Sequence, residues 1–284
     1  MDPLHGVILG IVQGLTEPLP ISSSAHLILV PWLLGWVEHS LTFDVALHMG
    51  TLAALLIYFW KDWWALLTAW LPGARRRASL AVTQDPLGTE DRRALNRQLG
   101  LGIVIGTIPA GIVGVLFDDV IEQSLRDPGL IGGVMLVASL VILAADRLGR
   151  RILELDSVTW SRALLVGVAQ ALALAPGVSR SGITISAGLA LGMTREAAAR
   201  FSFLLAAPVT GAAGILKLKD LFQTGIPADE QLAFATGIAA SFIVGLLAIG
   251  MLLRYLRRYS LTVFVVYRLI VVVLIFAMAT LRPA

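Results

Sequence analysis

The feature that most constrains this chain is a series of long apolar runs. There are six, near 42–60, 99–117, 129–146, 196–216, 232–253 and 261–281. Each approaches the roughly 20 residues that a helix needs to cross the hydrocarbon core of a bilayer. Charged residues make up only 14% of the 284, whereas soluble domains carry about 25%. The sequence therefore predicts an all-α polytopic membrane protein with six spans.

Composition narrows the chemistry further. The chain has no cysteine, which excludes disulfides, thiolate catalysis and cysteine-ligated metals. The net charge of +3 suits contact with the head groups of membrane lipids, and we expect no nucleic-acid partner. The N-terminus lacks a basic region ahead of an apolar core, so we expect no cleaved signal peptide.

Two further apolar segments are interrupted. The first, residues 4–36, is divided by "EPLPISSSAH", and the second, residues 160–191, by "APGVSRSG". Irregular backbone at membrane depth is tolerated only where it is buried in protein or lines a wet cavity. We interpret both segments as re-entrant helix–loop–helix pairs. A kinked full-length span is the alternative, since Pro and Gly are common in membrane helices.

An internal repeat favours the re-entrant interpretation. The run "FDVALHMGTLAALLIYFWKD" begins at Phe43 and "FSFLLAAPVTGAAGILKLKD" at Phe201, and their register holds without a gap. Each half of the single domain, about 1–147 and about 158–284, is expected to contain one re-entrant pair and three spans. An odd number of crossings inverts the second copy, so the two halves are predicted to be inverted repeats whose re-entrant tips meet near the midplane.

Loop charges predict the orientation. Under this topology one face receives most of the basic residues, and the positive-inside rule makes that face cytoplasmic. Its members are Lys61, Arg75, Arg76, Arg77, Arg92, Arg93, Arg97, Arg147, Arg150, Arg151, Arg254, Arg257 and Arg258, against Arg126, Lys217, Lys219 and Arg282 on the other face. The polar stretch 72–98 is expected to be the one long loop.

The two tips hold the candidate chemistry. The first supplies Gln13, Glu17, Ser22, Ser23, Ser24 and His26, and the second supplies Ser179, Arg180, Ser181 and Thr184. Gln13 and Glu17 are four residues apart, so both can share one helix face. Ionisable residues at membrane depth make a functional site the default hypothesis. The alternative is a buried Glu17–Arg180 ion pair that only locks the two halves together, although such pairs are weak sources of stability.

The residue types at the tips point to phosphate chemistry. The planar fork of Arg180 suits phosphate, and a helix beginning near Ser181 would add backbone N–H groups and its positive dipole end. The expected ligand is a phosphate or diphosphate. Glu17 and His26 supply an acid or base, or a carboxylate ligand for Mg²⁺. A serine at 22, 23 or 24 is either a nucleophile or a helix cap.

At these residues the sequence resembles a known family. The segments "QGLTEPLPISSSAH", "FDVALHMGT" and "PGVSRSGIT" are similar to signatures of the undecaprenyl-diphosphate phosphatases, the BacA/UppP type associated with bacitracin resistance, and the likeness covers nearly the whole chain. The resemblance implies removal of the terminal phosphate of the C55 polyprenyl diphosphate, which recycles the lipid carrier of cell-wall synthesis. It also implies a divalent cation and a bacterial inner-membrane location, and the predicted orientation makes the site open to the outer side.

Carried over residue by residue, the resemblance places function on a set of polar residues at the tips. These are Gln13, Glu17, Ser23, His26, Ser179, Arg180, Ser181 and Thr184. Gln13 stands at the first acidic position of the family's paired-Glu motif. It can ligate a metal through its carbonyl but cannot act as a base, so Glu17 carries more of the role, with Mg²⁺ or Ca²⁺ as the expected cation.

The expected mechanism is hydrolysis of a phosphoanhydride. Arg180, hydroxyls and backbone amides hold the diphosphate, the cation at Glu17 offsets charge on the oxygens, and Ser23 or a water attacks while Glu17 or His26 handles the proton. His48 contacts the site or only packs between helices. Arg268, inside the last span, is expected to snorkel to the interface. A transporter or flippase for an anionic lipid is the alternative function, and the sequence leaves a homodimer open.

Overall fold

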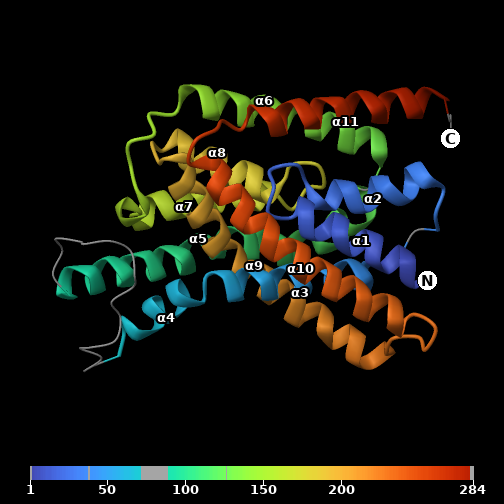
Figure 1. Cartoon of the computed structure of the whole chain (residues 1–284), viewed down its shortest axis with the longest axis horizontal. Helices are drawn as coiled ribbons and strands as arrows, with labels where there is room; N and C mark the ends of the chain where they lie inside the picture. The colour runs from blue at the N-terminus through green and yellow to red at the C-terminus, as the bar shows by residue number, and fades with distance from the viewer. Residues whose placement is uncertain (1, 38, 72–88, 126, 282–284) are drawn as a thin grey trace.

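The structure is a computed structural model that describes residues 2–37, 39–71, 89–125 and 127–281. Within these ranges the chain is helical apart from turns and one isolated bridge between Leu153 and Met193. Figure 1 shows the helices as one elongated bundle, with both chain termini at the same end. In chain order they are α1 (Pro3–Thr16), α2 (Ser23–Leu34), α3 (Leu41–Tyr58), α4 (Trp60–Thr68), α5 (Thr89–Ser124), α6 (Pro128–Leu148), the 3₁₀ turn η1 (Leu155–Ser157), α7 (Trp160–Leu172), α8 (Arg180–Ala190), α9 (Arg195–Thr224), α10 (Gln231–Leu256) and α11 (Thr262–Leu281).

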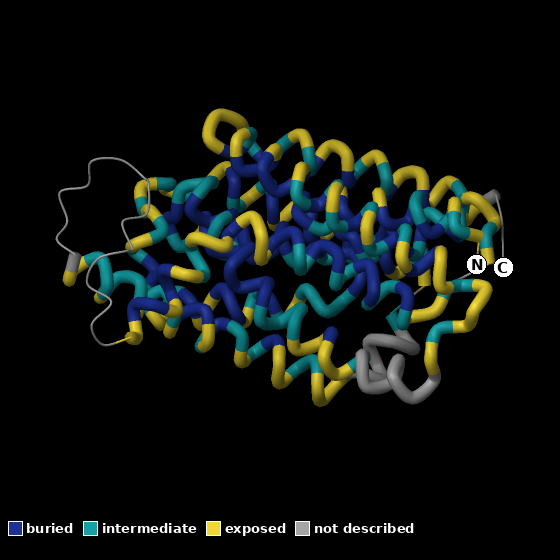
Figure 2. Tube along the Cα trace, turned by 60° about the horizontal axis from the view of Figure 1, so that its bottom comes forward, coloured by how far each residue is buried: buried dark blue, intermediate teal, exposed yellow. Residues whose placement is uncertain are grey.

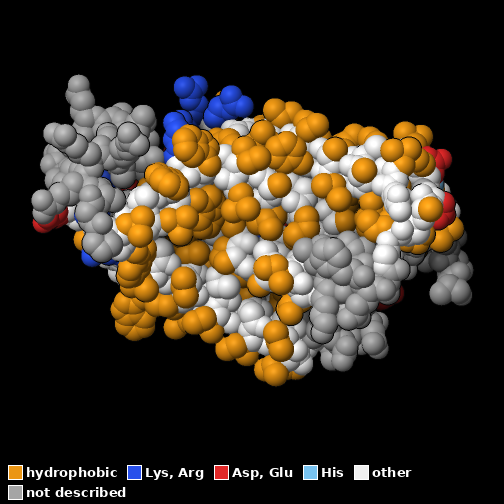
Figure 3. All heavy atoms as spheres, turned by 90° about the horizontal axis from the view of Figure 1, so that it is seen from below, with side chains coloured by type: hydrophobic (Ala, Val, Ile, Leu, Met, Phe, Trp, Pro, Cys, Tyr) orange, Lys and Arg blue, Asp and Glu red, His pale blue; other side chains and the backbone are white. Residues whose placement is uncertain are grey.

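The six predicted spans are confirmed as helices long and apolar enough to cross a membrane. They lie in α3, α5, α6, α9, α10 and α11, over Leu41–Tyr58, Glu90–Phe117, Pro128–Leu148, Arg195–Lys217, Gln231–Leu256 and Thr262–Thr280. Much of their surface is apolar and exposed: the large orange area in Figure 3 consists of hydrophobic side chains. The protein is therefore an all-helical, multi-pass membrane protein.

The two interrupted segments each form a helix, a break and a second helix. In the first, α1 ends at Thr16 and α2 begins at Ser23; in the second, α7 ends at Leu172 and α8 begins at Arg180. The residue before each second helix has the same left-handed backbone, with φ of 75° at both Ser22 and Ser179. Such a conformation is uncommon outside glycine and marks an imposed turn.

The helices before the breaks are held by very close backbone contacts. α1 packs along α10, and α7 packs along α5. A β-carbon on Gly10 would lie 2.3 Å from the carbonyl oxygen of Gly237, and one on Gly167 would lie 2.2 Å from that of Gly106. No side chain fits there, so glycine lets these helices approach as small residues do in membrane bundles. Figure 2 shows the resulting buried core along the centre of the bundle.

Ion pairs join several helices at the end of the bundle opposite the termini. Three residues at the start of α9 take part: Arg195 with Asp146, Glu196 with Arg257, and Arg200 with Asp62. Basic side chains gather at the same end in Figure 3. Of the residues used to predict orientation, Arg75, Arg76, Arg77, Arg126 and Arg282, together with the side chain of Lys219, lie outside the described residues.

One boundary prediction was wrong. The stretch 72–98 was expected to be loop throughout, but α5 begins at Thr89, and residues 72–88 lie outside the described residues. Glu90 and Asp91 occupy the first turn of α5, where acidic side chains interact favourably with the helix dipole. These charges made the segment look like loop, although they also suit the start of a helix.

The prediction for Arg268 was also wrong. This side chain was expected to snorkel to the interface, but Arg268 is 0% exposed. Its guanidinium bonds Ser139 on α6 and the carbonyl oxygen of Gly177 in the second break. Arg268 lies on the face of α11 that packs against protein. The residues around it in the sequence are mostly apolar, so their pattern does not show which face of this helix is buried.

Candidate active site

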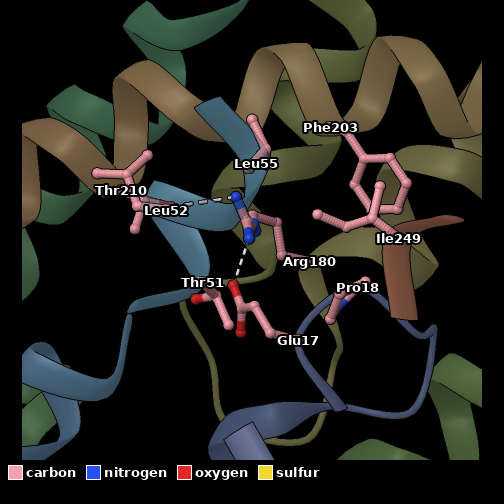
Figure 4. A pocket seen from close by; sticks show the side chains of 9 residues that line it. All are labelled: Glu17, Pro18, Thr51, Leu52, Leu55, Arg180, Phe203, Thr210 and Ile249. Atoms are coloured by element: carbon pink, nitrogen blue, oxygen red, sulfur yellow. Dashed lines mark hydrogen bonds and ion pairs between the residues drawn. The ribbon is translucent and has the colours of Figure 1, made fainter. Parts of the chain in front are cut away.

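The two breaks meet through an ion pair between Glu17 and Arg180. Glu17 directly follows α1, and Arg180 is the first residue of α8. Arg180 Nη2 donates to Glu17 Oε1, and the two side chains are 19% and 10% exposed. Figure 4 shows both side chains pointing into one pocket. Its lining comes from both breaks and from α3, α9 and α10: Glu17, Pro18, Thr51, Leu52, Leu55, Arg180, Phe203, Thr210 and Ile249.

Glu17 is the hub of the polar contacts. Its Oε2 accepts a hydrogen bond from Ser23 Oγ and another from Gln13 Nε2 at 3.2 Å. The same oxygen lies 3.5 Å from His48 Nε2. The structure therefore confirms the predicted shared helix face of Gln13 and Glu17, and it adds His48 of α3 to the contacts of the carboxylate.

Arg180 has a second anchor besides Glu17. Its Nη1 donates to Thr210 Oγ1 of α9 at 3.2 Å, as the second dashed line in Figure 4 shows. Thr184, one turn further along α8, donates to the Arg180 carbonyl oxygen at 2.7 Å and pairs with Ser202 Oγ at 2.6 Å. Thr184 therefore supports the first turn of α8, and none of its bonds goes to the guanidinium.

Three further hydroxyls shape the breaks. Ser179 caps α8, because its Oγ accepts from the Gly182 N–H at 3.2 Å. Ser181 Oγ donates to the Leu19 carbonyl oxygen at 2.9 Å and so links the second break to the first. Ser22 precedes α2 without a capping bond from its side chain, which instead lies 3.3 Å from Ser24 Oγ.

The two candidate histidines occupy different environments. His26 Nδ1 lies 2.7 Å from the Ser22 carbonyl oxygen, and its Nε2 lies 2.8 Å from the hydroxyl of Tyr267. Both ring nitrogens of His26 are thus paired away from Glu17. His48 Nδ1 lies 2.7 Å from the Asp44 carbonyl oxygen. A carbonyl can only accept, so Nδ1 carries a hydrogen, and Nε2 is the ring nitrogen that faces Glu17.

Glu17 and Gln13 are the candidate oxygen ligands for a divalent cation. Gln13 Oε1 is buried and has no hydrogen-bond partner among the described residues. An orphaned amide oxygen beside a carboxylate provides the oxygen ligands that Mg²⁺ and Ca²⁺ prefer. No group of three His, Asp or Glu side chains in the described part of the chain is arranged to hold a metal. A cation at Glu17 would therefore take its other ligands from groups of another kind, such as the amide oxygen of Gln13, water or phosphate.

Sequence reasoning missed two hydroxyls that line the pocket. Thr51 Oγ1 lies 3.5 Å from Gln13 Nε2, and Thr210 holds Arg180. Thr51 stands at the end of "FDVALHMGT", a segment that the resemblance had already singled out. Thr210 lies 30 residues beyond Arg180 within an apolar span, and no motif signals it.

Comparison with known proteins identifies the family of the chain. The family model described as "Bacitracin resistance protein BacA" matches residues 6–274. The chain belongs to this family. Its relatives include the undecaprenyl-diphosphatase of Geobacter sulfurreducens, 49% identical over 95% of this chain and 96% of that protein. That of Thermomicrobium roseum is 46% identical over 95% of both chains, and that of Desulforudis audaxviator 43% identical over 99% of this chain and all of that protein. The resemblance inferred from the motifs is confirmed.

Proposed function

We propose that this protein hydrolyses undecaprenyl diphosphate to the monophosphate and inorganic phosphate within the membrane, and so recycles the lipid carrier of cell-wall synthesis. The observation that carries the proposal is the pairing of Glu17 with Arg180 in a pocket inside the bundle. An anion-binding guanidinium and a carboxylate beside a hydroxyl are what phosphoanhydride hydrolysis requires. Relatives at 43–49% identity carry the name of this activity.

Arg180 binds the diphosphate in this proposal. Its two terminal nitrogens point to Glu17 and Thr210 inside the pocket, and a guanidinium can give two parallel hydrogen bonds to phosphate. The N-terminus of α8, which Arg180 begins, adds N–H groups and a favourable dipole. When the anion binds, Arg180 exchanges its contact with Glu17 for the phosphate, and the carboxylate becomes free for chemistry.

Glu17 and Gln13 would hold the divalent cation, Mg²⁺ or Ca²⁺. When bound, the cation would offset negative charge on the phosphate oxygens. Glu17 and the orphaned Gln13 Oε1 would supply its oxygen ligands, and His48 Nε2 lies 3.5 Å from Glu17 Oε2. In this structure the amide of Gln13 donates through Nε2 to Glu17, so the amide would have to turn over to bring Oε1 to a cation held by Glu17.

Ser23 is the proposed nucleophile, because its Oγ donates to Glu17. Glu17 takes the hydroxyl proton as Oγ bonds to the terminal phosphorus. The bond from that phosphorus to the bridging oxygen breaks, and the polyprenyl monophosphate leaves. A water oxygen then bonds to the phosphorus of the phosphoserine, the bond from phosphorus to Oγ breaks, Glu17 returns its proton to Oγ, and inorganic phosphate leaves with the protons of the water. His26, whose ring nitrogens are both paired, is assigned no proton transfer.

Phosphate release by the purified protein in detergent tests this function. We expect inorganic phosphate to appear when a polyprenyl diphosphate is added with Mg²⁺ or Ca²⁺, and a chelator to suppress it. Detergent abolishes the two compartments that transport requires. Absence of phosphate release, combined with lipid movement in proteoliposomes, would establish the transporter instead.

We also propose that the bundle consists of two inverted repeats, about 1–147 and about 158–284, whose broken helices are re-entrant. The swapped packing supports this arrangement: the first helix of each half packs along a span of the other half, α1 on α10 and α7 on α5. The shared left-handed serine before α2 and α8 supports it as well. In Figure 1, α1 and α7 enter the bundle from opposite ends.

The basic end of the bundle is proposed to face the cytoplasm of a bacterial inner membrane, with the site near the midplane and open to the outer side. The cysteine-free chain allows a direct test by single-cysteine labelling. Cysteines at Arg150 and Arg257 should react only from the cytoplasmic side, and one at Val37, which is 94% exposed, only from outside. Labelling of Arg150→Cys from outside would overturn the topology.

A further inference from the structure

Arg268 is the largest fully buried side chain in the described part of the protein. Its Nε donates to Ser139 Oγ at 2.8 Å, and its Nη2 donates to the carbonyl oxygens of Met135 at 3.1 Å and Gly177 at 2.7 Å. Among the described residues it has no ion pair, and Nη1 has no hydrogen-bond partner. The guanidinium is therefore held by hydroxyl and carbonyl oxygens from α6 and from the second break.

Burying the guanidinium of Arg268 inside a membrane span costs free energy. Ionisable residues inside membrane spans are rare and usually serve a function, and well-packed apolar residues often stabilise a protein as well as a buried charge does. The stability of the bundle alone therefore does not account for an arginine at 268. Its bond to Gly177 does suggest a role, because Gly177 lies three residues before Arg180.

Tyr267, the residue before Arg268, is connected to the first break. The hydroxyl of Tyr267 lies 2.8 Å from His26 Nε2, and His26 Nδ1 lies 2.7 Å from the Ser22 carbonyl oxygen. The carbonyl can only accept, so Nδ1 is the donor, and in the neutral ring the tyrosine hydroxyl donates to Nε2. Tyr267 is thus connected through His26 to the residue directly before Ser23.

Both targets are backbone groups in unusual conformations. Gly177 has φ of 96°, and Ser22 has φ of 75°. Glycine adopts such a φ freely, whereas Ser22 keeps it only while surrounding contacts hold it. The neighbours Tyr267 and Arg268 of α11 therefore contact the two turns that aim Ser23 and Arg180.

We propose that Tyr267 and Arg268 form a brace on α11 that fixes both breaks and so positions Ser23 and Arg180 for reaction. Tyr267 acts on the first break through His26, and Arg268 acts on the second through Gly177. These are positioning residues, since neither is placed in contact with the substrate. The proposal deepens the proposed function, but its geometry does not depend on that function.

Hydrogen exchange in detergent without substrate tests the brace. Tyr267→Phe removes only a hydroxyl, and Arg268→Lys keeps the charge but removes the fork. We expect Tyr267→Phe to speed exchange in peptides covering residues 17–26 only, and Arg268→Lys in those covering 173–180 only. The rise should be roughly tenfold, as expected for loss of a hydrogen bond involving a polar or charged group.

Tyr255→Phe and Arg254→Lys on α10 are the matched controls. Tyr255 stacks on Tyr259, and Arg254 bonds the Gly250 carbonyl oxygen of its own helix, so both should leave the two breaks unchanged. Unchanged exchange at both breaks in the brace variants would overturn the proposal, as would an equal rise throughout the chain. If the Lys variant fails to fold, Tyr267→Phe still decides the first arm.

Activity gives a separate readout. Misaligned reacting groups slow the chemical step more than they weaken binding, so each brace variant should lower kcat by roughly tenfold with KM changed less than about twofold. A rise in KM with normal kcat would contradict a positioning role. Hydrogen exchange is measured without substrate, so it tests the brace independently of whether the protein is a phosphatase.

Discussion

The two breaks of this bundle have a similar backbone conformation but different functional side chains. Ser22 and Ser179 both have φ of 75° and precede a helix, and they are 157 residues apart, as are Gln13 and Gln170. In this register Leu174 stands where the first break has Glu17, and Arg180 stands where it has Ser23. One scaffold therefore presents an acid and a hydroxyl from one side and a guanidinium from the other. The difference creates a site that neither break has alone.

The glutamines show the same divergence. Gln13 bonds Glu17 through Nε2. Gln170 is 1% exposed, and its side-chain oxygen and nitrogen have no partner among the described residues. Gln170 thus occupies the position that matches Gln13, but Leu174 stands where Glu17 would be its partner. Substitutions at matched positions can therefore separate the catalytic role from the structural one.

The largest effect is expected for Glu17→Gln. This change removes the carboxylate that the proposal uses as base and cation ligand, so phosphate release should fall by at least about 10²-fold, as for loss of a positioned acid or base. KM should change little, because Arg180 remains. Glu154→Gln, on the loop after α6, is the control. Normal turnover in Glu17→Gln would leave only a structural ion pair.

Arg180→Lys should have the next largest effect. Lysine keeps the charge but cannot give two parallel hydrogen bonds to one phosphate. Loss of a charge-assisted hydrogen bond costs about 1.5–3 kcal/mol, which corresponds to roughly 10- to 100-fold in kcat/KM. The surface change Arg257→Lys should be silent in the same phosphate-release assay. An equally silent Arg180→Lys would remove Arg180 from the substrate site.

A smaller and opposite pair of effects is expected for the two glutamines. Gln13→Leu removes a bond to Glu17 and should slow phosphate release by about tenfold. Gln170→Leu removes an unpartnered buried amide, so the Tm should rise by a few degrees and activity should not change. Thermal unfolding and turnover of both purified variants provide the check. Matching losses of activity would show that the two breaks are not differentiated.

The smallest effect is expected for Gln13→Glu. A second carboxylate beside Glu17 restores the acidic pair of the family motif and should bind the cation more tightly. Turnover should stay within a few-fold of wild type, while the Mg²⁺ or Ca²⁺ concentration for half-maximal rate falls. A titration of phosphate release against each cation measures this. An unchanged cation requirement would argue against Gln13 as a ligand.

The sequence predicted features that depend on neighbours along the chain. Six apolar runs became six helices, and the prolines near Glu17 and the serines near Arg180 marked the breaks. The two breaks were predicted to meet, but an ion pair between Glu17 and Arg180 was only the alternative, and the expected partner of Arg180 was a phosphate or diphosphate.

Contacts that depend on helix rotation could not be predicted. Thr210 and Arg268 lie in spans whose neighbours are apolar on every side, so periodicity does not tell which face points inward. The Tyr267–His26 contact joins residues 241 positions apart, and no local pattern encodes it. A lone polar residue in such a span gives a hint of function without giving its partner.

The most direct test of a single site built from both breaks is the double variant Glu17→Gln with Arg180→Lys. Residues that act as a unit on one phosphate have non-additive effects. Phosphate release in detergent should therefore be about as slow in the double variant as in the slower single variant. If the two losses multiply instead, Glu17 and Arg180 act independently, and the account of one site shared by the two breaks is wrong.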